Sequence, residues 1–246
     1  MGVFFWSVSS VDWRGPLIHT GGSAAFLEFL KSLFPPELSP EFLGLALSAS
    51  WQTLAYAVAG ITLAVLVGFP MGVIASGSVS ASPRTGFGLA VAARFILAAM
   101  RSIHELVWAV LFVPAFGLSS LTVILALALP YGGILGRIYG ELLHQVPEEP
   151  LRALRVSGAS PFRVLLYGRL PMALPDMMGY TFYRLECAIR SAAIMSFVGI
   201  RGLGYEIQLS LNDLLFDQVW TLLLFMVGIV VLVDLWSTRV RRSLVS

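Results

Sequence analysis

Long apolar stretches separated by short polar segments dominate the chain. No charged residue occurs from Phe42 to Pro83, and about 20 mostly apolar residues suffice for a helix to cross a membrane. The pattern predicts five membrane-spanning helices, over residues 43–76, 87–113, 121–143, 171–198 and 214–236. Turns rich in glycine, serine or proline separate several of them. We therefore expect an all-α polytopic membrane protein whose membrane domain covers residues 42–240.

The N-terminal segment, residues 1–41, has a different pattern. Residues 22–34 place large apolar side chains at helical spacing, but Glu28 and Lys31 interrupt them and Pro35 and Pro36 end the run. This stretch is too short and too charged to span a membrane, which favours an amphipathic helix on its outer surface. Residues 3–8 are apolar but too few to cross, so they could only be the remnant of a sixth span.

Composition agrees with a membrane location. Hydrophobic residues make up 57 % of the chain and charged residues only 12 %, whereas a soluble domain carries roughly 25 % charge. The net charge of +2 gives no reason to expect a polyanionic partner such as a nucleic acid. The single cysteine, Cys187, excludes a disulfide framework and a cysteine metal cluster. We expect no metal site in this chain.

The distribution of basic residues predicts an orientation, because lysine and arginine gather on the cytoplasmic side of membrane proteins. If the loop over residues 146–170 is cytoplasmic, only Arg14, Lys31 and Arg201 lie outside. Ten arginines lie on the cytoplasmic side, namely Arg84, Arg94, Arg137, Arg152, Arg155, Arg163, Arg169, Arg239, Arg241 and Arg242. We therefore expect a multi-pass protein of a bacterial-type cytoplasmic (inner) membrane with the loop and the C-terminus inside.

The loop over residues 146–170 has the pattern of a docking element. Leucine and valine side chains give it apolar faces, and Gly158 provides a bend with almost no side-chain bulk. Ser160 and Pro161 then favour the start of a second short helix. The alternative is an ordinary amphipathic cytoplasmic loop.

The same loop resembles the "EAA" coupling loop of binding-protein-dependent ATP-driven importers of type I (MetI-like). Glu149, Ala153, Gly158 and the pair Leu170-Pro171 match that motif. The resemblance implies two short helices that insert into a cleft of a cytosolic ATPase. It also implies the residues that couple to the ATPase, which are Glu149, Arg152, Ala153, Ser157, Gly158, Ala159 and Pro161.

Further stretches are similar to the permeases of phosphonate importers. They include residues 101–109, 183–193, 198–204 and 234–242. The resemblance implies an additional N-terminal span, of which only residues 3–8 could remain here, and the chain departs from that family in placing Arg201 in a turn that is usually built of small residues. That turn implies an outer gate, formed by Gly199, Arg201, Gly202 and Gly204.

The resemblance implies the partners and the cargo as well. We expect a second permease (a copy of this chain or a sibling), two ATPase subunits that bind ATP and magnesium, and an extracytoplasmic solute-binding protein. No cofactor is expected in this chain. The cargo is expected to be a phosphonate or a related phosphorus oxyanion such as phosphite, hypophosphite or phosphate.

Ionisable residues within the predicted spans are candidates for function, because burying them in a membrane is costly. Arg101 and Glu105 are four residues apart, as are Glu186 and Arg190, so each pair is expected on one helix face. The candidates for the translocation path are Arg101, His104, Glu105, Tyr183, Arg184, Glu186 and Arg190. The Arg/Glu pairs could instead be structural and hold neighbouring helices together.

Catalytic motifs are missing from the sequence. Lys31 is the only lysine, so no glycine-rich phosphate loop ends in Lys-Ser or Lys-Thr. We therefore expect that the chain is not an enzyme by itself. Two alternatives remain: a proton-coupled secondary transporter that uses His104, Glu105 and Glu186, and a membrane enzyme with His104 and Glu105 as acid and base. Neither needs a docking loop centred on a glycine.

Overall fold

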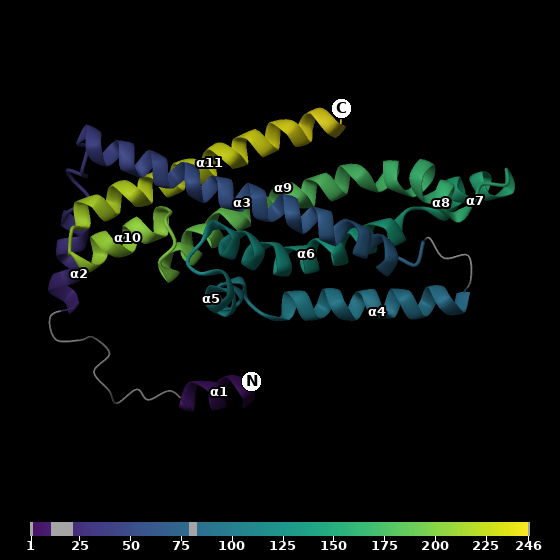
Figure 1. Cartoon of the computed structure of the whole chain (residues 1–246), viewed down its shortest axis with the longest axis horizontal. Coiled ribbons are helices and arrows are strands. Elements are labelled where there is room, and N and C mark those ends of the chain that lie inside the picture. Colours follow the sequence, from purple (N-terminus) through teal and green to yellow (C-terminus); the bar gives the residue numbers. More distant parts are fainter. Residues whose placement is uncertain (1, 11–21, 79–82, 246) are drawn as a thin grey trace.

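The computed structural model describes residues 2–10, 22–78 and 83–245, and every regular element within them is helical. The helices are α1 (Gly2–Ser9), α2 (Gly22–Lys31), α3 (Pro40–Ala75), α4 (Pro83–Ser102), α5 (Glu105–Phe116), α6 (Ser120–Gln145), α7 (Glu148–Val156), α8 (Pro161–Val164), α9 (Leu170–Met195), α10 (Leu203–Asn212) and α11 (Phe216–Val245). Figure 1 shows the long helices side by side as an elongated bundle.

Three described helices, α3, α6 and α11, are each long and apolar enough to cross a membrane. The number rises to five if two bent pairs each count as one span. One pair is α4 with α5, and the other joins residues 161–198 to α10 across a bend of 47°. The expectation of an all-α protein with several membrane helices is confirmed.

Helices α3 and α6 form the centre of the bundle through glycine contacts. A β-carbon on Gly72 would lie 2.5 Å from the carbonyl oxygen of Gly136, and one on Gly68 would lie 2.7 Å from that of Gly132. Glycines at such positions let two helix backbones approach closely. Tyr139 of α6 is buried beside this contact and donates to or accepts from Thr181 of α9 at 2.6 Å. The glycine contact thus joins α3 to α6, and the Tyr139 hydrogen bond joins α6 to α9.

The prediction of one continuous helix over residues 87–113 was wrong. Helix α4 ends at Ser102 and α5 begins at Glu105, and the two helices are bent by 86°. His104 lies between them in an extended conformation, and its Nδ1 accepts a hydrogen bond from the backbone N–H of Leu106 at 3.2 Å. The break therefore has a local cause, since His104 caps the new helix.

The two ends of the bundle carry different elements (Figure 1). Helices α7 and α8 lie at one end, and α2 and α10 lie at the other. Helix α2 docks on α11: the ring of Phe29 stacks on Trp220 with centroids 4.7 Å apart, and the Trp220 Nε1 donates to the carbonyl of Phe29 at 2.7 Å. Arg14, counted above toward the outer side, lies outside the described residues.

Candidate functional site

The predicted coupling loop forms two short helices joined by a glycine turn. Helix α7 ends at Val156, and Gly158 then adopts a φ of +82°, which disfavours any residue with a side chain. The N–H of Ala159 donates to the carbonyl of Leu154 at 3.1 Å and closes the turn. Ser160 caps α8 by accepting from the N–H of Arg163. The chain thus reverses direction at a rigid corner.

The outer face of this corner is exposed and partly apolar. Of the residues predicted to couple to an ATPase, six are exposed and one is half-buried: Glu149, Arg152, Ala153, Ser157, Gly158 and Pro161 are exposed, and Ala159 is half-buried. The structure adds Val156, Phe162 and Tyr167, which are 89 %, 59 % and 71 % exposed. Sequence reasoning did not single out these three, because they are not part of the coupling-loop motif.

An ion-paired arginine anchors α7 to the membrane helices. Arg169 is buried, and it donates to the carbonyl of Leu143 at the end of α6 at 2.8 Å and to the Glu148 carboxylate at 2.6 Å. Arg155 donates to the other oxygen of Glu148 at 2.7 Å. The hydrogen bond from Arg155 and the nearby arginine charges lower the pKa of Glu148.

A π-helical turn over Leu165–Arg169 brings this arginine inward. Gly168 in the same turn faces α7, where a β-carbon would lie 2.7 Å from the side chain of Leu151. From the sequence alone, Arg169 is only one of the arginines expected on the cytoplasmic side. The structure makes it the link between α6, α7 and the start of α9.

A second cluster of polar side chains lies where α5, α6 and α9 meet. The Ser191 hydroxyl donates to Glu105 at 2.5 Å and shares a 3.0 Å hydrogen bond with the hydroxyl of Tyr131. His104 Nε2 lies 3.6 Å from the other oxygen of Glu105. These groups line a cavity of about 200 Å³ together with Arg190. The structure thus brings together His104, Glu105 and Arg190 from the predicted path.

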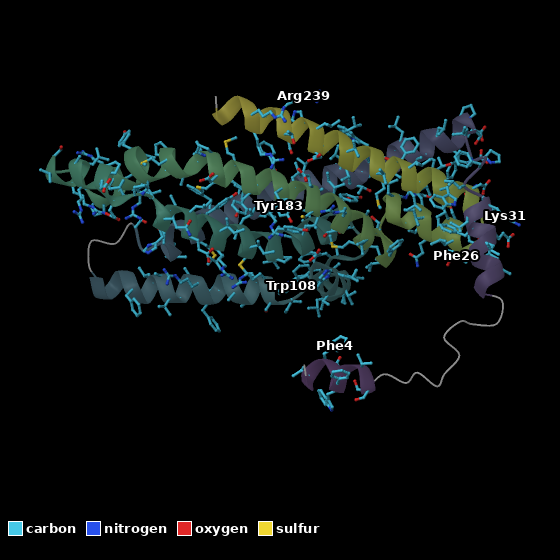
Figure 2. The ribbon with its side chains drawn as sticks, turned by 180° about the vertical axis from the view of Figure 1, so that it is seen from behind. Phe4, Phe26, Lys31, Trp108, Tyr183 and Arg239 are labelled. Carbon is cyan, nitrogen blue, oxygen red and sulfur yellow. The ribbon has the colours of Figure 1, made fainter. Side chains whose placement is uncertain are left out.

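The other predicted path residues do not line this cavity. Arg101 lines a separate cavity between α4 and α6. The guanidinium of Arg184 lies 5.4 Å from the ring centre of Tyr183, and its buried Nε has no hydrogen-bond partner among the described residues. Figure 2 places Tyr183 of α9 and Trp108 of α5 in the middle part of the bundle.

Both predicted Arg/Glu pairs are corrected by the structure. Arg101 and Glu105 do not share a helix face, because α4 ends between them. Glu186 accepts from Ser237 of α11 at 2.9 Å and lies 3.9 Å from Arg241, whereas Arg190 contacts the Cys187 sulfur at 3.5 Å. Glu186 therefore joins α9 to α11 rather than pairing within its own helix.

The predicted outer gate is a tightly packed turn between α9 and α10. Gly199 has a φ of +103°, and a β-carbon on Gly202 would lie 2.5 Å from the Ser196 hydroxyl. A β-carbon on Gly204 would collide with the carbonyl of Ala193. Arg201 is exposed at this turn. Two of its small residues are thus required by packing and one by its backbone conformation.

Metal ligands are not clustered in the part of the chain that the structure describes. No three His, Cys, Asp or Glu side chains there lie close enough to hold a metal ion.

Comparison with known proteins places this geometry in a family. Residues 68–246 match the family model described as binding-protein-dependent transport system inner membrane component. The phosphite transport system permease protein PtxC of Stutzerimonas stutzeri is 33 % identical over 221 residues, which cover 88 % of this chain and 78 % of that protein. The phosphate-import permease protein PhnE of Mycolicibacterium smegmatis is 29 % identical over 97 % of this chain but only 43 % of its own length.

A solved structure supports the fold. A chain of the MetNI methionine ABC transporter in an inward-facing conformation superimposes with a TM-score of 0.73 at 22 % identity, covering 84 % of this chain and 99 % of that one. The expected type I importer permease fold is confirmed.

Proposed function

The chain belongs to the family of binding-protein-dependent transport system inner membrane components, and we propose that it is the membrane permease of an ATP-driven importer of phosphonate or a related phosphorus oxyanion. Phosphite, hypophosphite and phosphate are the related candidates. The names of the two relatives above, a phosphite permease and a phosphate-import permease, support this class of cargo.

The rigid corner at Gly158 carries the proposal. Helices α7 and α8 present exposed Val156 and Phe162 on a loop whose inner side is anchored by Arg169. An exposed apolar surface of this kind is typical of a protein contact. Because the loop is anchored, its displacement by a partner would be transmitted to α6 and α9. A mobile linker would absorb the same displacement.

The partners follow from this role. Two ATPase subunits, each with ATP and magnesium, dock on the cytoplasmic loops of this chain and of a second permease. A solute-binding protein delivers the cargo to the opposite side. Closure of the ATPase pair moves residues 147–166, and that movement opens the cavity between the permeases outward. Hydrolysis returns it inward.

The cluster of Glu105, Ser191 and Tyr131 lies on the path in this proposal. It joins three helices that must shift relative to one another during alternating access. Arg190 beside it is a donor that suits the oxygens of a phosphorus oxyanion. Each hydrogen bond of the cluster can be exchanged for a hydrogen bond to the passing oxyanion, as a path that must also release its cargo requires.

The test is ATP hydrolysis by this permease, co-purified with its ATPase in lipid nanodiscs. Binding protein loaded with phosphonate, phosphite or phosphate is titrated in, and one loaded form should stimulate hydrolysis. Gly158→Trp should abolish that stimulation. Gly117→Trp is the matched control, because Gly117 also has a positive φ, of +69°, with open space around it, but lies outside the loop.

Equal stimulation in both glycine variants would contradict coupling through the loop. Uptake driven by a proton gradient without any ATPase would instead support the secondary transporter that uses His104, Glu105 and Glu186.

A further inference from the structure

A cavity lined by arginines lies between α4 and α6, apart from the cluster at Glu105. Its volume is about 480 Å³, and Arg94, Arg101, Arg137 and His144 line it together with a single carboxylate, Glu141. Three guanidinium groups thus face one acidic group. Such a surplus of positive charge in a hollow attracts anions.

The arginines are only partly engaged by the protein. Arg94 uses its Nε to donate to the carbonyl of Ala75 at 3.0 Å, which leaves its two terminal nitrogens for another acceptor. Arg137 binds Glu141 at 2.6 Å. Arg101 makes no hydrogen bond or ion pair with any described residue and is exposed to the cavity that it lines.

Helix geometry holds these groups in register. Arg94 and Arg101 are two turns apart on one face of α4, a rise of about 10 Å. Gly133 lets α4 approach α6 closely: a β-carbon there would lie 2.7 Å from the carbonyl oxygen of Leu97 and 3.0 Å from the backbone nitrogen of Arg101. The guanidinium groups of α4 and Arg137 of α6 therefore line one hollow on a fixed frame.

We propose that this cavity binds a tetrahedral phosphorus oxyanion. A guanidinium fork donates two parallel hydrogen bonds to such a group, and several forks can share its oxygens. The oxyanion has two possible sources. It is either the transported cargo, in which case the inference rests on the proposed function, or the headgroup of an anionic phospholipid. The second source is reachable because α4 exposes Phe87 and Phe95 on its outer surface.

The first arm of the test measures the free oxyanion. The full chain is reconstituted in nanodiscs of phosphatidylcholine, and binding of phosphite and of inorganic phosphate is measured by equilibrium dialysis. Arg101→Gln should weaken binding about tenfold, since a charge-assisted pair is lost. Arg101→Lys keeps the charge but not the fork and should fall between. Arg239→Gln, an exposed arginine of α11 outside the cavity, should bind like the parent chain.

The second arm measures the lipid. The same four proteins are purified from membranes that contain phosphatidylglycerol, and retained lipid is counted by native mass spectrometry. If Arg101→Gln loses retained phosphatidylglycerol but still binds phosphite and phosphate like the parent chain, the ligand of the cavity is the lipid headgroup. If Arg101→Gln instead loses phosphite or phosphate binding, the ligand is the transported cargo. Because Arg101 has no partner in the described chain, its substitution should not unfold the protein.

Unchanged binding of all three probes in Arg101→Gln would overturn the proposal. These assays need neither the ATPase nor the binding protein. A failure here, with stimulated ATP hydrolysis intact, would therefore leave the proposed function standing.

Discussion

Arg169 is the residue on which the connection between α7 and the membrane helices depends most. Arg169→Gln should lower the free energy of unfolding by about 1–3 kcal/mol, because the Leu143 carbonyl loses its charged donor and the Glu148 carboxylate keeps only Arg155 of its two. It should also lower the amount transported per ATP hydrolysed. Thermal unfolding and paired uptake and hydrolysis assays measure the two effects. Arg169→Lys should recover part of both, and a variant that loses stability but keeps the transport ratio would show a purely structural role.

The partner of Arg169 gives a prediction about pH. Folding lowers the pKa of Glu148 from its ordinary 4.5, so its ionised form is favoured in the folded chain. Its contribution to stability is therefore present above pH 4.5 and is lost as the pH falls through the lowered value. The difference in stability between the parent chain and Glu148→Gln, measured by thermal unfolding, should shrink below pH 4.5. A constant difference down to acidic pH would mean that Glu148 contributes by shape rather than by charge.

Ser191 holds the second cluster together. Ser191→Ala removes a donor from Glu105, whose side chain is 16 % exposed, and a partner from Tyr131. We expect a loss of about 1–3 kcal/mol in the free energy of unfolding, which thermal unfolding in detergent would measure. Ser48→Ala is the control, because that exposed serine bonds only to the carbonyl of Leu45 in its own helix. Equal melting temperatures for the two variants would contradict the role of Ser191.

Residue spacing in the sequence did not predict these partners. The i,i+4 rule requires one unbroken helix, and it failed for Arg101 and Glu105 because His104 starts a new helix between them. It failed for Glu186 because α11 offers Ser237 as a partner across the bundle. Glu148 and Arg169 are 21 residues apart, and only the reversal of the chain at α7 and α8 brings them together.

At the scale of whole elements, the close contact of α3 with α6 should be sensitive to single methyl groups. Gly72→Ala places a β-carbon 2.5 Å from the Gly136 carbonyl oxygen, so it should destabilise the chain by about 1–3 kcal/mol. Gly44→Ala on the same helix meets no atom within 4 Å and should stabilise by about 0.5–1 kcal/mol, as alanine usually does in a helix. Thermal unfolding of both variants measures the difference. A tolerated Gly72→Ala would mean that α3 and α6 are free to move apart.

The helices themselves were largely predictable because apolar length decides where a chain crosses a membrane. The bend of 86° was not, because the polar residues Arg101, His104 and Glu105 lie within a longer apolar stretch and were interpreted as charges inside one span rather than as a helix break. The docking of α2 on α11 was not predicted from the sequence either. Phe29 has the spacing of an amphipathic helix, but only the fold shows that it stacks on Trp220. Sequence pattern gives the length of an element, whereas its neighbour depends on tertiary packing.

For the whole molecule, the testable consequence is its orientation in the membrane. The loop of α7 and α8 lies at one end of the bundle and the start of α3 lies near α2 at the other (Figure 1). Ten arginines assigned to the loop's side against three basic residues on the other favour a cytoplasmic loop. Since Cys187 is the only cysteine, its replacement by alanine gives a background free of thiols.

In that background, Ser157→Cys and Ser39→Cys place one exposed thiol at each end of the bundle. A membrane-impermeant maleimide added to intact cells or spheroplasts should label Ser39→Cys at once and Ser157→Cys only after lysis. The reverse pattern would invert the orientation and leave the loop unable to reach a cytosolic ATPase. Labelling of both thiols in intact cells would place both ends of the bundle on the same side and contradict the assignment of the helices as spans. The parent chain without cysteine reports any background, so each pattern has a single interpretation.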